Sequence, residues 1–224
     1  MTENNTPDVC LVVLDTVRRK SLQSVSTPTL DSLISGGTYH RAVAPAPWTA
    51  PSHAAMLTGQ FGWQHGVGQS SQQFSPSVES LPEALQNCGY STVGISNNPY
   101  VSEEFGFDRG FDTFLSNNGA RYQSGLTPSA VVQEDINPYL SAIKQVVTHN
   151  RPLLSALNLL DHKLYSVDDR GAATTISKLN RLLDDIEGPV FTFLNLMEAH
   201  TTYWPPEPFR SRNLPSGVSD EVAR

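Results

Sequence analysis

Two short, nearly continuous apolar runs, each followed by polar residues, constrain the fold of this chain most strongly. Residues 8–15 have the sequence Asp-Val-Cys-Leu-Val-Val-Leu-Asp, and residues 190–197 have Val-Phe-Thr-Phe-Leu-Asn-Leu-Met. Apolar runs of this length are typical of strands that are buried on both faces of a parallel sheet. We therefore predict an α/β fold with a mostly parallel central sheet flanked by helices.

Further elements are predicted between these runs from helix caps, glycines and apolar spacing. Helices are expected at residues 27–34, 80–86 and 172–186, and strands at residues 38–43 and 90–95. Residues 129–168 are mostly helical in pattern and are divided by Pro138 and Pro152. We expect a single domain over residues 1–224, with a helical insertion or cap at about residues 120–185.

The segment around Thr49 has its own local signals. The sequence Ala-Pro-Ala-Pro at residues 44–47 favours extended backbone, and Pro51 suits the first turn of a helix that ends at Gly59. Thr49 is thus expected at or just before a helix N-terminus, where backbone N–H groups favour a bound anion.

Charge and composition limit the classes of partner. The formal net charge is −7, which argues against nucleic acid or an anionic membrane as the main partner, because both select basic surfaces. Cys10 and Cys88 do not have the spacing of a zinc site or a disulfide framework. The polar N-terminus lacks the features of a secretory signal, so we expect a cytoplasmic protein. The expected partner is a small anionic ester, and the oligomeric state is left open.

Reactive side chains lie where predicted strands meet loops. Asp15 follows the first strand, Thr49 and His53 lie at the start of a helix, and Glu198 and His200 follow the last strand. Such ends converge in α/β active sites. Each residue also has a structural interpretation, because a carboxylate after a strand is often a turn or cap residue and a single histidine is often structural.

The order of several motifs resembles the opening part of the sulfatase family within the alkaline-phosphatase superfamily. The similar stretches are residues 14–18, 27–33, 46–59, 65–67, 89–92, 106–112 and 197–200. In that family a Cys/Ser-x-Pro-x-Arg motif supplies the nucleophile, and the cysteine or serine is oxidised to formylglycine. The matching stretch here is Thr49-Ala50-Pro51-Ser52-His53, and a threonine cannot become formylglycine. The resemblance to phosphate-handling relatives implies direct attack by Thr49, with His53 where the family has an arginine.

The resemblance also implies a metal site and further site residues. Asp15 matches the first metal-binding carboxylate, and Thr49 would share the metal, which is Ca²⁺, Mg²⁺ or Mn²⁺, or Zn²⁺ if histidines join. His200 matches a histidine that contacts the transferred group or the leaving oxygen. Asn97 and Asn98 either line the site as substrate-binding residues or form a turn with Pro99.

Two hypotheses follow, and they differ in whether the site is complete. The family completes its metal site with an Asp-His or Asp-Asn pair far downstream, and no comparable pair follows His200, so the fold is expected to lack its C-terminal part. The first hypothesis is a metal-dependent hydrolase or transferase that acts on sulfate or phosphate esters through Thr49. The alternative is a truncated, non-catalytic module with a binding or structural role. A nucleotide-binding protein ranks last, because no glycine-rich loop follows the first strand.

Overall fold

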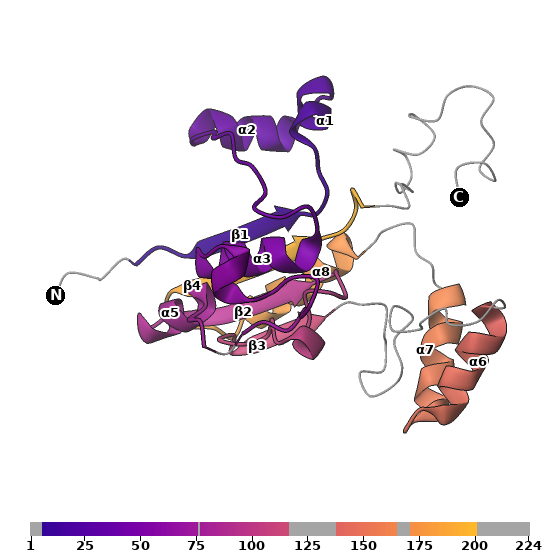
Figure 1. Cartoon of the computed structure of the whole chain (residues 1–224). Coiled ribbons are helices and arrows are strands. Elements are labelled where there is room, and N and C mark those ends of the chain that lie inside the picture. Colours follow the sequence, from indigo (N-terminus) through magenta and orange to yellow (C-terminus); the bar gives the residue numbers. More distant parts are fainter. Residues whose placement is uncertain (1–5, 76, 117–137, 165–170, 201–224) are drawn as a thin grey trace, which may run out of the picture.

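A computed structural model describes residues 6–75, 77–116, 138–164 and 171–200. Its centre is a four-stranded, entirely parallel sheet with the order β1-β4-β2-β3 (Figure 1). The strands are β1 (Val9–Leu14), β2 (Ser91–Ser96), β3 (Thr113–Ser116) and β4 (Val190–Leu196). The predicted α/β fold with a parallel sheet is therefore confirmed.

Helices occupy most of the remaining described chain. In order they are α1 (Arg19–Ser24), α2 (Pro28–Gly36), α3 (Thr49–Thr58), α4 (Gly62–His65), α5 (Leu81–Asn87), the 3₁₀ turn η1 (Glu103–Phe105), α6 (Pro138–Thr148), α7 (Pro152–Leu164) and α8 (Ala172–Leu183). The helices predicted at residues 27–34, 80–86 and 172–186 are thus present. Among the described helices, none is both long and apolar enough to cross a bilayer.

The sheet has a helix layer on each face. On one face, Ala50, Ala54 and Leu57 of α3 pack against Phe191 and Phe193 of β4. On the other face, α8 packs against β2 and β4 through a smaller apolar cluster that includes Leu179, Val93, Ile95 and Leu194. Small alanines on α3 let this helix lie close to the sheet, so its N-terminus is held firmly beside the ends of the strands.

The N-terminal part differs from expectation in two places. β1 lies at the edge of the described sheet and pairs only with β4, so Val9, Val12 and Leu14 are 36%, 47% and 39% exposed. The prediction that this strand is buried on both faces is therefore wrong for the described chain. The strand predicted at residues 38–43 is also wrong: this stretch is irregular and exposed, and none of the four described strands pairs with it.

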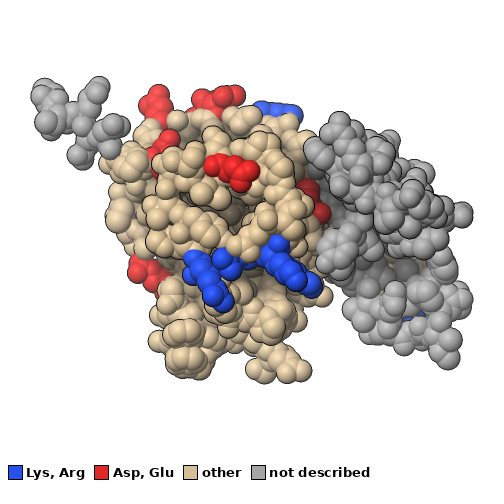
Figure 2. Space-filling model, turned by 90° about the horizontal axis from the view of Figure 1, so that it is seen from above, with Lys and Arg blue, Asp and Glu red and all other residues tan. Residues whose placement is uncertain are grey.

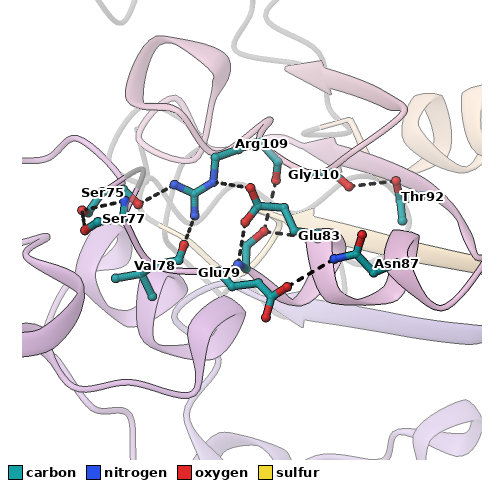
Figure 3. Close-up of polar contacts among 10 residues, drawn as sticks. Ser75, Ser77, Val78, Glu79, Glu83, Asn87, Thr92, Arg109 and Gly110 are labelled. Carbon is teal, nitrogen blue, oxygen red and sulfur yellow. Dashed lines mark hydrogen bonds and ion pairs between the residues drawn. The ribbon is translucent and has the colours of Figure 1, made fainter.

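Arg109 fixes the loop that leads into α5 (Figure 3). Its guanidinium donates to the carbonyl oxygens of Ser75 and Val78, and its Nε lies 3.0 Å from a carboxylate oxygen of Glu83. Glu83 in turn accepts from the Ser80 N–H at 2.7 Å and completes a capping box at the start of α5. Arg109 is therefore a structural, salt-bridged residue.

Candidate active site

Three side chains from three different elements meet at the carboxyl edge of the sheet. Asp15 follows β1, Asn98 follows β2, and Thr49 is the first residue of α3. The Asn98 Nδ2 lies 2.7 Å from Asp15 Oδ2, and Thr49 Oγ1 lies 3.4 Å from that oxygen and 3.4 Å from Asn98 Nδ2. Asp15 and Asn98 are buried, whereas Thr49 is half-buried. The structure thus brings together the predicted metal carboxylate, the predicted nucleophile and one predicted substrate-binding residue.

The orientation of the Asn98 amide is fixed by its own turn. Its Oδ1 accepts a hydrogen bond from the Tyr100 N–H at 2.9 Å, and its backbone N–H donates to Ser96 Oγ at 3.2 Å. The Nδ2 group therefore faces Asp15 and Thr49. Since this side presents N–H donors, Asn98 is suited to donate to an anion and unsuited to bind a metal.

Asn97 points away from this cluster. Its Oδ1 accepts from the Thr175 Oγ1 of α8 at 3.0 Å, and Gly171 lies close to its amide. The two neighbouring side chains therefore have different partners, since Asn97 contacts α8 and Asn98 contacts Asp15 and Thr49. Asn97 thus makes a contact with α8 in this structure, and its expected substrate-binding role stays a prediction.

His53 is buried one turn into α3. Its Nδ1 lies 2.9 Å from the Thr49 carbonyl oxygen, and its Nε2 lies 2.6 Å from Asn195 Nδ2. Burial lowers the pKa of His53, although the Thr49 carbonyl and the negative charge of Asp15 act in the opposite direction. The ring is therefore neutral near pH 7 and uses both nitrogens within the protein. This geometry suits support of the nucleophile better than proton transfer to a substrate.

The loop after β4 is tied to the loop after β1. Thr16 Oγ1 donates to the Ala199 carbonyl at 2.8 Å, and the His200 N–H donates to the Met197 carbonyl at 2.9 Å. Glu198 accepts from the Ala172 N–H at 2.9 Å and so acts as a structural cap of α8. His200 is half-buried on this loop, and its predicted catalytic role stays a prediction.

The predicted metal ligands supply two oxygen donors. Asp15 offers a carboxylate and Thr49 a hydroxyl, both of the hard type that Mg²⁺, Ca²⁺ and Mn²⁺ prefer. Within residues 6–200 as far as they are described, no three His, Cys, Asp or Glu side chains gather as a metal cluster. The pair therefore fits a hard cation in donor type, and the further donors would come from water, substrate or other parts of the protein.

Two residues of the site were missed from the sequence. Asn195 contacts His53, and Met197 Sδ lies 3.3 Å from Asn98 Nδ2. A single signal could have identified Asn195: it is the amide side chain within an otherwise largely apolar strand, and buried amides need a polar partner.

The chain is thus an α/β protein whose candidate site lies at the carboxyl ends of its parallel strands. A sequence profile of the family described as Sulfatase matches residues 7–214. The chain belongs to the sulfatase family, as its motifs predicted.

Several individual proteins are similar to this chain. It is 31% identical over 85 residues to an N-acetylglucosamine-6-O-sulfatase of Bacteroides thetaiotaomicron, across 38% of this chain and 15% of that protein. The phosphonate monoester hydrolase of Agrobacterium radiobacter has a TM-score of 0.59 at 18% identity, across 96% of this chain and 45% of that one. A protein whose structure was solved with its substrate D-glucosamine-2-N,6-O-disulfate has a TM-score of 0.56 at 17% identity, across 89% of this chain and 36% of that one. The chain spans less than half the length of each relative.

Proposed function

We propose that this chain carries the nucleophile of a metal-dependent enzyme that acts on sulfate or phosphate esters. The observation that carries the proposal is the hydroxyl of Thr49 at the first position of α3, within 3.4 Å of both Asp15 and Asn98. Family membership supports an ester hydrolase, and the fold neighbours include a phosphonate monoester hydrolase. Phosphate esters are the favoured substrates, because threonine cannot form the formylglycine that sulfatases use.

In the proposed reaction, Thr49 Oγ attacks the phosphorus or sulfur of the ester. The Thr49–phosphorus or Thr49–sulfur bond forms while the bond from that atom to the ester oxygen breaks. The ester oxygen departs with its electron pair and takes a proton from water, and the hydroxyl proton of Thr49 passes to Asp15 along the hydrogen bond between them. A divalent cation held by Asp15 and Thr49 would favour the ionised hydroxyl and neutralise charge on the transferred group. Asn98 donates from Nδ2 to the transferred anion. The alcohol is released, and water or an acceptor alcohol then takes the group from Thr49.

Local charge supports an anionic substrate. The segment between Asp15 and Thr49 has four basic residues against one acidic residue, within a chain of net charge −7. The basic residues Arg18, Arg19, Lys20 and Arg41 are all exposed. Figure 2 shows Lys and Arg side chains gathered beside a hollow on the face seen from above. Positive charge on an otherwise acidic protein favours the approach of an anion.

The test is turnover of aryl phosphate monoesters, aryl phosphate diesters and aryl sulfate in the presence of Mn²⁺ or Ca²⁺. We expect turnover to fall by at least about a hundredfold in Thr49→Ala, because the attacking atom is removed. Thr58→Ala, at the other end of the same helix, is the matched control and should keep wild-type turnover. Equal turnover by wild type and Thr49→Ala would reject the nucleophile.

A non-catalytic module is the second candidate, and one observation favours it. The described part of the site offers one carboxylate and one hydroxyl, fewer donors than the six or more that Ca²⁺ takes. Titration calorimetry with Mn²⁺ or Ca²⁺ separates the candidates. The non-catalytic interpretation would be rejected if the wild type turns over an ester and also binds metal, and if Asp15→Ala loses the metal binding. Metal binding without turnover on all three substrate classes would favour it.

A further inference from the structure

Asn195 is a fully buried amide in the middle of the molecule. It lies in β4 on the same face as Phe191 and Phe193, and its Nδ2 lies 2.6 Å from His53 Nε2. Its Oδ1 is buried and has no hydrogen-bond partner among the described residues. Burial of an unpaired carbonyl oxygen costs stability, so this amide is a poor choice for packing alone.

The hydrogen bonds of His53 specify one form of its ring. Because a carbonyl oxygen can only accept, the Nδ1 must carry the proton that it donates to Thr49 at 2.9 Å. A neutral ring then has a lone pair on Nε2, and Asn195 Nδ2 donates to it. The ring is held at both nitrogens, in one tautomer and one orientation.

These contacts link Thr49 to the sheet. His53 is hydrogen-bonded to the Thr49 carbonyl and to Asn195, and Asn195 lies opposite Val13 of β1 in the sheet. β1 leads directly to Asp15, whose N–H donates to the Leu196 carbonyl of β4 at 2.9 Å. The position of Thr49 Oγ relative to Asp15 therefore depends on the contact between His53 and Asn195.

We propose that Asn195 is a positioning residue for Thr49 that acts through His53. It fixes the first turn of α3 against β4, so that the Thr49 hydroxyl faces Asp15 and Asn98. A donor at this place matches the lone pair of the neutral ring, which gives the buried amide a role despite its unpaired oxygen. The catalytic part of this inference rests on the proposed function, whereas the link from Asn195 to the Thr49 turn does not.

The first arm of the test needs no activity. Nitrogen-15 NMR of the protein should show His53 as the Nδ1–H tautomer. In Asn195→Leu, which has a similar volume, we expect mixed tautomers and shifted backbone signals for residues 49–53, with α8 unchanged. The control Thr192→Val lies on the opposite face of β4 and should leave His53 unchanged. An Nε2–H tautomer in wild type, or signals of residues 49–53 that do not respond to Asn195→Leu, would overturn the proposal.

The second arm measures catalysis. Asn195→Leu should lower kcat by roughly tenfold to a hundredfold with little change in KM, because misplacement of a nucleophile costs about this much. In a His53→Leu background the same substitution should have no further effect, since the residue acts through His53. Unchanged kcat, or an equal loss in both backgrounds, would overturn the positioning role. If wild-type turnover proves independent of Thr49, the proposed function fails, and the NMR arm still decides the structural link.

Discussion

At the scale of single residues, the site is built from strained and buried groups. Thr16 is the only residue other than glycine with a positive φ in the described chain, at 61°, a backbone conformation that β-branched residues rarely adopt. The strained position follows Asp15 directly, and its hydroxyl is bound to Ala199. Backbone strain of this kind persists only where surrounding contacts enforce it. Here the contacts between the loops after β1 and β4 do so, which fixes the backbone next to Asp15.

His53 makes stability depend on pH. Its pKa is lowered from the ordinary value of 6.5 by burial, so below pH 6.5 the unfolded state binds more protons than the folded state. The contribution of His53 to the free energy of unfolding is thus fully present above pH 6.5 and is lost as the pH falls. We expect wild type to lose stability more steeply than His53→Gln below pH 6.5, by up to about 1.4 kcal/mol per pH unit.

Urea unfolding between pH 7.5 and pH 5 measures this difference. His40→Gln is the matched control, because His40 is exposed, and its curve should follow that of wild type. Parallel curves for wild type and His53→Gln would show that His53 is not held neutral by the fold.

At the scale of elements, the helices around the site are held by close contacts with loops. Gly110 lies against the start of α5, and a Cβ added there would lie 2.5 Å from the Glu83 backbone nitrogen (Figure 3). The same glycine has a φ of 81°, and its carbonyl accepts from Thr92 Oγ1 of β2 at 2.9 Å. It therefore joins α5 to the sheet at a place where no side chain fits.

Substitution of Gly110 tests this contact. Gly110→Ala should destabilise the fold by roughly 2–4 kcal/mol, because steric overlap adds to the cost of the left-handed backbone. Gly66→Ala is the matched control: its φ of 74° is similar, but a Cβ there meets nothing within 4 Å. We expect that variant to lose only about 1 kcal/mol. Equal losses of melting temperature in the two variants would contradict the packing account.

The elements also show which features could be predicted from sequence. The strands that precede Asp15 and His200 and the helix that starts at Thr49 follow from local patterns, namely apolar runs, Pro51 and Gly59. The roles of Asn97 and Asn98 could not be separated, because their directions depend on how β2 pairs with β4. Asn195 was missed because its partner, His53, lies 142 positions away in the chain. Long-range pairing, and not local propensity, decided each of these points.

At the scale of the whole molecule, the strand order explains how distant residues meet. β4 lies between β1 and β2, so the last strand of the described chain brings together the ends that carry Asp15 and Asn98. α3 packs against one face of the sheet through β4, and its first residue, Thr49, lies at the same edge as Asp15 and Asn98. The order of the strands in the sheet could not be predicted from the sequence, because apolar runs show where strands lie in the chain but not which strands pair. The strand order also explains why residues of β1 are exposed, since among the described strands β1 pairs with β4 alone.

Mass spectrometry of the protein, quenched during turnover of an aryl phosphate ester, tests directly whether Thr49 is the nucleophile. We expect a phosphoryl group on the peptide that contains Thr49, absent from Thr49→Ala and present in Thr58→Ala. A phosphoryl group on another residue, or turnover that persists in Thr49→Ala, would contradict the assignment of Thr49 as the nucleophile.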